Sequence, residues 1–142
     1  MADRRICDLL GLELPILQAP MAGAQGAELA AAVSAAGGLG ALPCAMLSAA
    51  QIRSEVSAIR AKTDRPFNLN FFCHKPPTPD AAREAAWRAR LLPFFDETGA
   101  DPAGIGAASR APFDADFCAL VEEVRPAVGW FHFGLPAPEL VA

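Results

Sequence analysis

Short apolar segments and helical segments alternate four times along this chain, and this succession constrains the fold more than any other feature. The apolar segments are short and nearly continuous, as buried strands of a parallel sheet are. Each intervening helix would return the chain to the start of the next strand through a right-handed crossover. The sequence therefore predicts an α/β fold, either a doubly wound sheet or half of a (β/α)8 barrel.

Turn and capping signals delimit the expected elements. Gly37 and Gly38 end the first helix, and Ser48 with Gln51 forms a capping box for the second. Strands are expected at residues 16–19, 39–42, 67–72 and 127–133. Helices are expected at residues 26–38 and 49–62, from Asp114 to Pro126, and from Pro138. A further helix is expected to begin at Asp80 and to bend or break near Pro93. Residues 1–14 are a lead-in to this succession, in which Ile6, Leu9 and Leu10 are expected to cover the bottom of the fold. Because no linker or repeat interrupts it, residues 1–142 are expected to form one domain.

Composition excludes several classes of protein. The chain has 142 residues, of which 53% are hydrophobic, and a net charge of −4, which excludes a disordered chain or a basic nucleic-acid binder. Its apolar runs are too short to cross a membrane, so no membrane partner is expected. Near the start, Asp8, Glu13 and Pro15 interrupt any signal-peptide core, and a cytoplasmic protein is expected. The four cysteines lack Cys-x-x-Cys spacing, which favours free, mostly buried thiols and no metal site.

The segment PILQAPMAG, residues 15–23, combines a strand with a sharp stop. Pro20 cannot donate to a sheet ladder and marks the end of the strand. In parallel α/β folds, ligands bind at the carboxyl ends of the strands. Free backbone N–H groups at Met21 and Ala22, beside the polar Gln18, suit a flat polar ligand. An ordinary strand-to-helix turn explains the segment equally well.

Polar side chains also mark the third and fourth strands. Alternation in PFNLNFF places Asn68, Asn70 and Phe72 on one face. Buried amides cost free energy unless they are paired, so this face is the informative one. His132 lies near the end of the fourth strand, where it could line a cavity or form a core hydrogen bond to backbone. If the strands run parallel, Met21, Asn70 and His132 are all expected at one end of the sheet. The first strand-to-helix turn lacks a G-x-G-x-x-G or Walker pattern, which argues against the usual nucleotide folds.

Four sequence blocks together resemble the nitronate monooxygenase family, formerly called 2-nitropropane dioxygenases. They occur in the family's order and cover nearly the whole chain: PILQAPMAG, AAVSAAGGLGALP, PFNLNFF and FHFGLP. The resemblance implies a TIM barrel that holds FMN and oxidises alkyl nitronates with oxygen. A TIM barrel needs eight β-α units and about 250 residues, whereas about four units are present here. The chain is therefore expected to be the N-terminal half of such a barrel, a single partial domain over residues 1–142.

The resemblance also implies roles for individual residues. Ala19, Pro20 and Met21 match the segment whose main chain meets the flavin ring, and Asn70 matches the family's flavin-binding asparagine. His132 is the candidate catalytic residue, which would stabilise an anionic nitronate or the reduced flavin. A purely structural amide at Asn70 and a core histidine at His132 remain alternatives.

Other residues, and the function itself, have more than one interpretation. Asn68 lies deeper, where a structural hydrogen bond is expected; Gln18 could pair with backbone or bind a ligand; and His74 is expected to be a solvated loop residue. A flavin-dependent enoyl or quinone reductase of the same barrel type shares the turn after the first strand. A non-catalytic, truncated half-barrel is a further alternative. In either half-barrel, the exposed apolar face predicts self-association.

Overall fold

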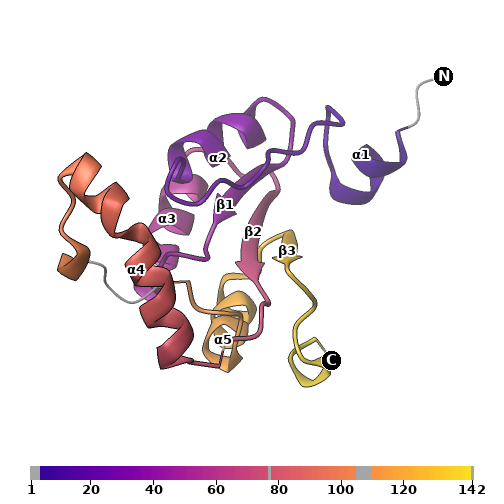
Figure 1. The fold of residues 1–142 in the computed structure, drawn as a ribbon. Helices are drawn as coiled ribbons and strands as arrows, with labels where there is room; N and C mark the ends of the chain where they lie inside the picture. Colours follow the sequence, from indigo (N-terminus) through magenta and orange to yellow (C-terminus); the bar gives the residue numbers. More distant parts are fainter. Residues whose placement is uncertain (1–3, 77, 105–109, 142) are drawn as a thin grey trace. The chain divides into compact units, whose positions relative to one another are not determined.

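The computed structural model describes residues 4–76, 78–104 and 110–141, and shows an α/β fold built on a three-stranded parallel sheet (Figure 1). The chain divides into two compact units. Residues 1–74 and 110–142 form the larger unit, which contains the sheet, and residues 75–109 form the smaller one.

The sheet has the order β1-β2-β3, with all strands parallel. Its strands are β1 (Gly40–Pro43), β2 (Phe67–Phe72) and β3 (Val128–His132), within one or two residues of the prediction. The register aligns Asn68 with Ala41 and Val128, and Asn70 with Pro43 and Trp130. Because the strands are parallel, their carboxyl ends all meet at one edge of the sheet.

The expected first strand, Ile16–Ala19, extends the sheet by a single parallel bridge, between Leu17 and Leu39. Leu39 N–H donates to Ile16 O, and Gln18 N–H donates to Leu39 O, both at 2.9 Å. The prediction that this segment is buried was wrong, since Ile16 is 56% exposed and Leu17 is 39% exposed. Among the described residues it has one strand neighbour, so its other edge and much of its side-chain surface stay uncovered.

Three helices pack with the sheet in the main core, and their limits follow from capping. They are α2 (Ala27–Ala35), α3 (Ala49–Arg60) and α5 (Ala115–Val124). Ser48 and Gln51 make the expected reciprocal capping box, and Asp114 accepts from the N–H of Phe117. The side chains at Ile52, Val56 and Ile59 are buried, which confirms the helical spacing.

Helix α2 lies unusually close to β1, and glycine makes this approach possible. A Cβ at Gly40 would lie 1.9 Å from Ala30 O, a separation that no side chain tolerates. Ser34 tightens the same contact, because its hydroxyl donates to Pro66 O at 2.9 Å and accepts from Gly40 N–H at 3.1 Å. Gly40 therefore serves helix-on-sheet packing.

A second, smaller core includes the short helix α1 (Arg5–Leu10), which the sequence predicted only as a lead-in. Its members come from the N-terminal segment and from the beginnings of the strands, and are Cys7, Leu12 and Leu39 with Ile6, Leu10, Val128 and Trp130. Ile6 and Leu10 thus take the expected covering position, whereas Leu9 is 77% exposed.

The smaller unit consists mainly of α4 (Ala81–Thr98), followed by η1 (Pro102–Gly104). Asp80 caps α4 as expected, by accepting from Arg83 N–H at 2.9 Å. Of the bend or break expected near Pro93, the break does not occur, because α4 continues through Pro93 to a left-handed cap at Gly99. An interior proline costs about 3 kcal/mol or more, and the surrounding alanine-, arginine- and leucine-rich sequence favours a helix strongly enough to continue. None of the described helices is long and apolar enough to cross a membrane.

Candidate functional site

Asn70 and His132 meet at the carboxyl edge of the sheet. Asn70 Nδ2 lies 2.7 Å from His132 Nδ1 and donates to Trp130 O at 3.2 Å. The register explains the contact, since Phe72 pairs with His132 and Asn70 pairs with Trp130 on the adjacent strand. Asn70 is 2% exposed, whereas His132 is exposed to solvent. A buried amide therefore supports an accessible imidazole.

Backbone and ring contacts also hold His132. Cys73 N–H donates to His132 O at 2.8 Å. The ring of Phe72 stands nearly perpendicular to the imidazole, with centroids 6.3 Å apart, and the ring of Phe133 lies 6.2 Å away. These contacts restrict the imidazole while leaving much of it open to a ligand.

The turn after His132 carries backbone strain. Phe133 has φ = +66° and Gly134 has φ = +136°. A phenylalanine in the left-handed region is uncommon, and such strain costs about 1–3 kcal/mol. The Phe133 side chain is 71% exposed and makes an edge contact with Phe72 at 4.9 Å. Strain of this kind concentrates at ligand-binding turns, and here it lies directly after His132.

The segment Ala19–Met21 lies at the same edge, because its strand runs parallel to β1. Gln18 fixes it: Nε2 donates to Ala41 O at 3.1 Å, and Oε1 accepts from Ala41 N–H at 3.0 Å. Of the two roles considered for Gln18, the structure therefore shows backbone pairing. The backbone N–H groups of Met21 and Ala22 have no acceptor among the described residues, and Met21 is 52% exposed. This turn presents two free donors, as the sequence predicted.

The shared location of these residues was itself a prediction, and it is confirmed. The parallel register puts Met21, Asn70 and His132 at one edge of the sheet. Asn70 shares its face with its register partner Trp130, opposite the face on which Leu69 and Phe71 pack in the main core. The roles of Ala19, Pro20, Met21, Asn70 and His132 remain predictions.

Asn68 departs from its predicted role. It is fully buried, yet neither Oδ1 nor Nδ2 has a hydrogen-bond partner among the described residues. The expected structural hydrogen bond is therefore absent in this part of the chain. Its register partners, Ala41 and Val128, have apolar side chains that offer no partner.

Two other titratable side chains, those of Cys44 and His74, show no feature of a catalytic residue. Burial raises the pKa of Cys44 from 9.0 to about 12, against a smaller lowering by a hydrogen bond with the Asn70 backbone, so Cys44 is a neutral thiol at ordinary pH. His74 is half-buried and contacts the ring of Phe72 at 6.3 Å, so it is less solvated than predicted. The described residues include no group of three His, Cys, Asp or Glu side chains that could hold a metal ion.

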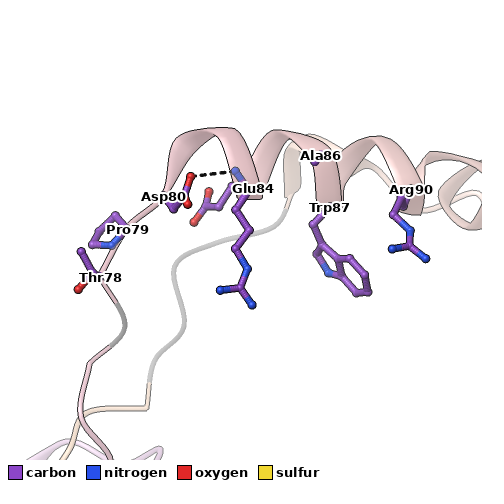
Figure 2. Close-up of a pocket in the computed structure, with 8 residues that line it drawn as sticks. Thr78, Pro79, Asp80, Glu84, Ala86, Trp87 and Arg90 are labelled. Atoms are coloured by element: carbon purple, nitrogen blue, oxygen red, sulfur yellow. Dashed lines mark hydrogen bonds between the residues drawn. The ribbon is translucent and has the colours of Figure 1, made fainter.

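The smaller unit contains a separate groove of about 700 Å³ beside the first turns of α4, which the sequence analysis did not identify (Figure 2). Trp87 is 57% exposed on this groove, and the guanidinium of Arg90 lies 5.4 Å from its ring centroid. Arg83 and Glu84 also line it. The sequence did contain a signal for this groove, because a helical tryptophan with arginines three and four residues away places cations beside an aromatic ring.

Comparison with known proteins gives a consistent result. A family model described as nitronate monooxygenase matches residues 3–142. A nitronate monooxygenase from Paraburkholderia phytofirmans is 44% identical over 98% of this chain, and one from Pseudomonas aeruginosa is 43% identical over 99%. The chain spans only 38% and 40% of the length of these two relatives.

Solved structures show the same pattern. A nitroalkane oxidase from Streptomyces ansochromogenes superimposes with a TM-score of 0.77 and 32% identity, over 96% of this chain and 38% of its own. FabK from Thermotoga maritima matches with a TM-score of 0.50 and 35% identity, over 70% of this chain and 29% of its own. The similarity therefore extends over 70–99% of this chain and over a minor part of each longer protein.

Proposed function

The chain belongs to the nitronate monooxygenase family, and from this premise we propose that it is the N-terminal part of an FMN-dependent enzyme that oxidises alkyl nitronates with molecular oxygen. The observation that carries the proposal is the cluster at the carboxyl edge of the sheet, where Asn70 contacts His132 at 2.7 Å. In parallel α/β folds this edge is where ligands bind.

The residues at this edge fit a flavin. The turn after Gln18 offers two backbone N–H donors, at Met21 and Ala22, that no described residue uses. Asn70 adds an amide fixed in place between two strands. The polar edge of a flavin ring takes such donors, and protein groups near that edge tune its chemistry. Ala19, Pro20, Met21 and Asn70 are therefore the proposed FMN-binding residues.

The chemistry divides between the cofactor and the protein. FMN, when bound, supplies the redox chemistry between the nitronate and oxygen. The backbone at Met21 orients the ligand, and His132 stabilises negative charge close to it. The neutral thiol of Cys44 takes no part, because it is buried on the helix-packed side with a raised pKa.

We further propose that these residues form half of a (β/α)8 barrel, as one partial domain over residues 1–142. Three parallel strands and the bridged segment at Leu17 supply four neighbouring strand positions. Barrels of this type build their phosphate site from the loops after strands 7 and 8. The phosphate of FMN would therefore be held by residues of the second half of the barrel, outside residues 1–142. The half-barrel would self-associate through its uncovered face.

A direct comparison tests the proposal. The chain is expressed alone and within the longer reading frame that the proposal requires, and flavin absorbance, oxygen uptake with an alkyl nitronate and sedimentation are measured. We expect FMN and turnover from the longer protein, and neither from the chain alone, which should sediment as oligomers. Since the chain alone lacks the proposed phosphate site, it should retain no FMN, and its turnover should be undetectable.

Two outcomes would reject the proposal. Stoichiometric FMN and steady turnover from the monomeric short chain would remove the half-barrel. Consumption of NAD(P)H with an enoyl thioester or a quinone, with no oxygen uptake on a nitronate, would assign the longer protein to the flavin reductases instead.

A further inference from the structure

The side-chain amide of Asn70 faces two acceptors on the neighbouring strand. Its Nδ2 lies 3.2 Å from Trp130 O and 2.7 Å from His132 Nδ1. A backbone carbonyl can only accept a hydrogen bond, so the amide nitrogen, and not its oxygen, must face Trp130. Reversing the amide would place two oxygens against each other beside a buried strand. The carbonyl of Trp130 therefore fixes the orientation of the Asn70 amide.

This orientation determines the protonation of the imidazole. The amide nitrogen that faces His132 can only donate, so Nδ1 must accept. A neutral imidazole with an accepting Nδ1 carries its proton on Nε2. We propose that Asn70 is a positioning residue that holds His132 as the neutral Nε2–H tautomer, so that His132 presents a hydrogen-bond donor to an anionic oxygen at this edge of the sheet.

The other contacts of His132 leave Nε2 free for that role. Its backbone O is bonded to Cys73 N–H at 2.8 Å, and its ring packs edge-on against Phe72. Within the described part of the chain, Nε2 has no hydrogen-bond partner. The ring therefore has one nitrogen committed to the protein and one available to a ligand.

The tautomer restricts the chemistry available to His132, a conclusion that rests on the proposed function for the identity of the ligand. With Nδ1 occupied by Asn70 and a proton already on Nε2, the neutral ring has no free lone pair with which to remove a proton from carbon. It can donate to an oxygen that is already negative. His132 is thus suited to a nitronate anion and unsuited to deprotonating a neutral nitroalkane.

The test uses the full chain labelled with [15N]histidine, whose two histidines, His74 and His132, give a simple spectrum. Two-bond ¹H–¹⁵N spectra of the rings distinguish a protonated ring nitrogen from an unprotonated one. We expect His132 at neutral pH to show protonated Nε2 and unprotonated Nδ1. In Asn70→Asp, the carboxylate can only accept, so Nδ1 should become protonated. Asn68→Ala changes the same face two residues away and should leave the His132 pattern unchanged.

Clear results would overturn the assignment. A protonated Nδ1 on His132 in the unaltered chain would do so without any variant, even if Asn70→Asp failed to fold. An unchanged His132 pattern in Asn70→Asp would show that Asn70 does not set the tautomer. Because the spectra need neither FMN nor a nitronate, they are independent of turnover: the expected pattern in a protein inactive on nitronates would reject the proposed function and keep the tautomer.

Discussion

At its central residues, 68–71, strand β2 is equally buried on both faces, and the two faces are chemically opposite there. On one face, Leu69 and Phe71 are 0% and 1% exposed and belong to the apolar core shared with the helices. On the other, Asn68 and Asn70 are 0% and 2% exposed. The first face gains free energy from apolar burial, whereas the second buries amides that yield little or nothing. The degree of burial alone therefore does not show whether a residue of β2 stabilises the fold. For the buried amides, the presence or absence of hydrogen-bond partners shows it.

The largest expected effect lies on the apolar face. Phe71 packs against three aromatic rings, those of Phe113, Phe117 and Phe131, with centroids 5.1–6.4 Å away. Phe71→Ala should lower the free energy of unfolding by about 3–5 kcal/mol, measured by urea denaturation. Phe133→Ala is the matched control, since that ring is 71% exposed, and should change stability by less than about 0.5 kcal/mol. Equal losses in the two variants would contradict the contrast between them.

The second effect depends on pH and also belongs to the apolar face, where Cys44 is buried. Because burial raises its pKa from 9.0 to about 12, the folded state keeps a proton that the unfolded state releases. Its contribution to stability is full below about pH 9 and is lost as the pH rises toward 12, by about 1.4 kcal/mol per pH unit. The chain has no tyrosine to titrate in this range.

Denaturation between pH 8 and 11 checks this slope. Cys44→Ala should flatten it, whereas Cys118→Ala, at a half-buried cysteine, should leave it in place. A slope that persists in Cys44→Ala would assign the alkaline loss to other groups.

The contrast between the faces also shows what the sequence could predict. Local signals sufficed for β2 at residues 67–72, for the capping box of α3 and for the caps at Asp80 and Asp114, because each depends on neighbours a few residues away. They also placed Asn70 and His132 at one edge of the sheet, since parallel strands end together.

The features that the sequence could not predict depend on how distant strands pair in the folded chain. The 2.7 Å contact between Asn70 and His132 depends on a register between residues 62 positions apart, which no local pattern encodes. The exposure of Ile16 depends on which strands flank it, and Asn68 lacks a partner because its register neighbours are Ala41 and Val128.

The third effect tests the polar face. Neither polar atom of Asn68 has a hydrogen-bond partner among the described residues. No hydrogen bond therefore compensates the free-energy cost of removing this amide from water. Asn68→Leu should raise the free energy of unfolding of this chain by about 1–3 kcal/mol, measured by urea denaturation. Leu69→Asn is the reciprocal change on the apolar face and should destabilise the fold. A loss of stability in Asn68→Leu would show that a polar group pairs with this amide in solution.

The smallest effect on stability, and the largest on ligand binding, is expected at Asn70. Unlike Asn68, Asn70 has partners, and removing a typical hydrogen bond costs about 0.5–1.5 kcal/mol, more if a partner is stranded. Its acceptors stay solvated at His132, so Asn70→Ala should remain folded. In the longer FMN-dependent enzyme proposed above, the same change should weaken FMN retention, measured by flavin absorbance after gel filtration. Asn68→Ala, one strand repeat away on the same face, should retain FMN. If Asn70→Ala kept its flavin and melted early, Asn70 would be a structural amide like any other, and the polar face of β2 would lose its proposed distinction between a residue that binds and one that is merely buried.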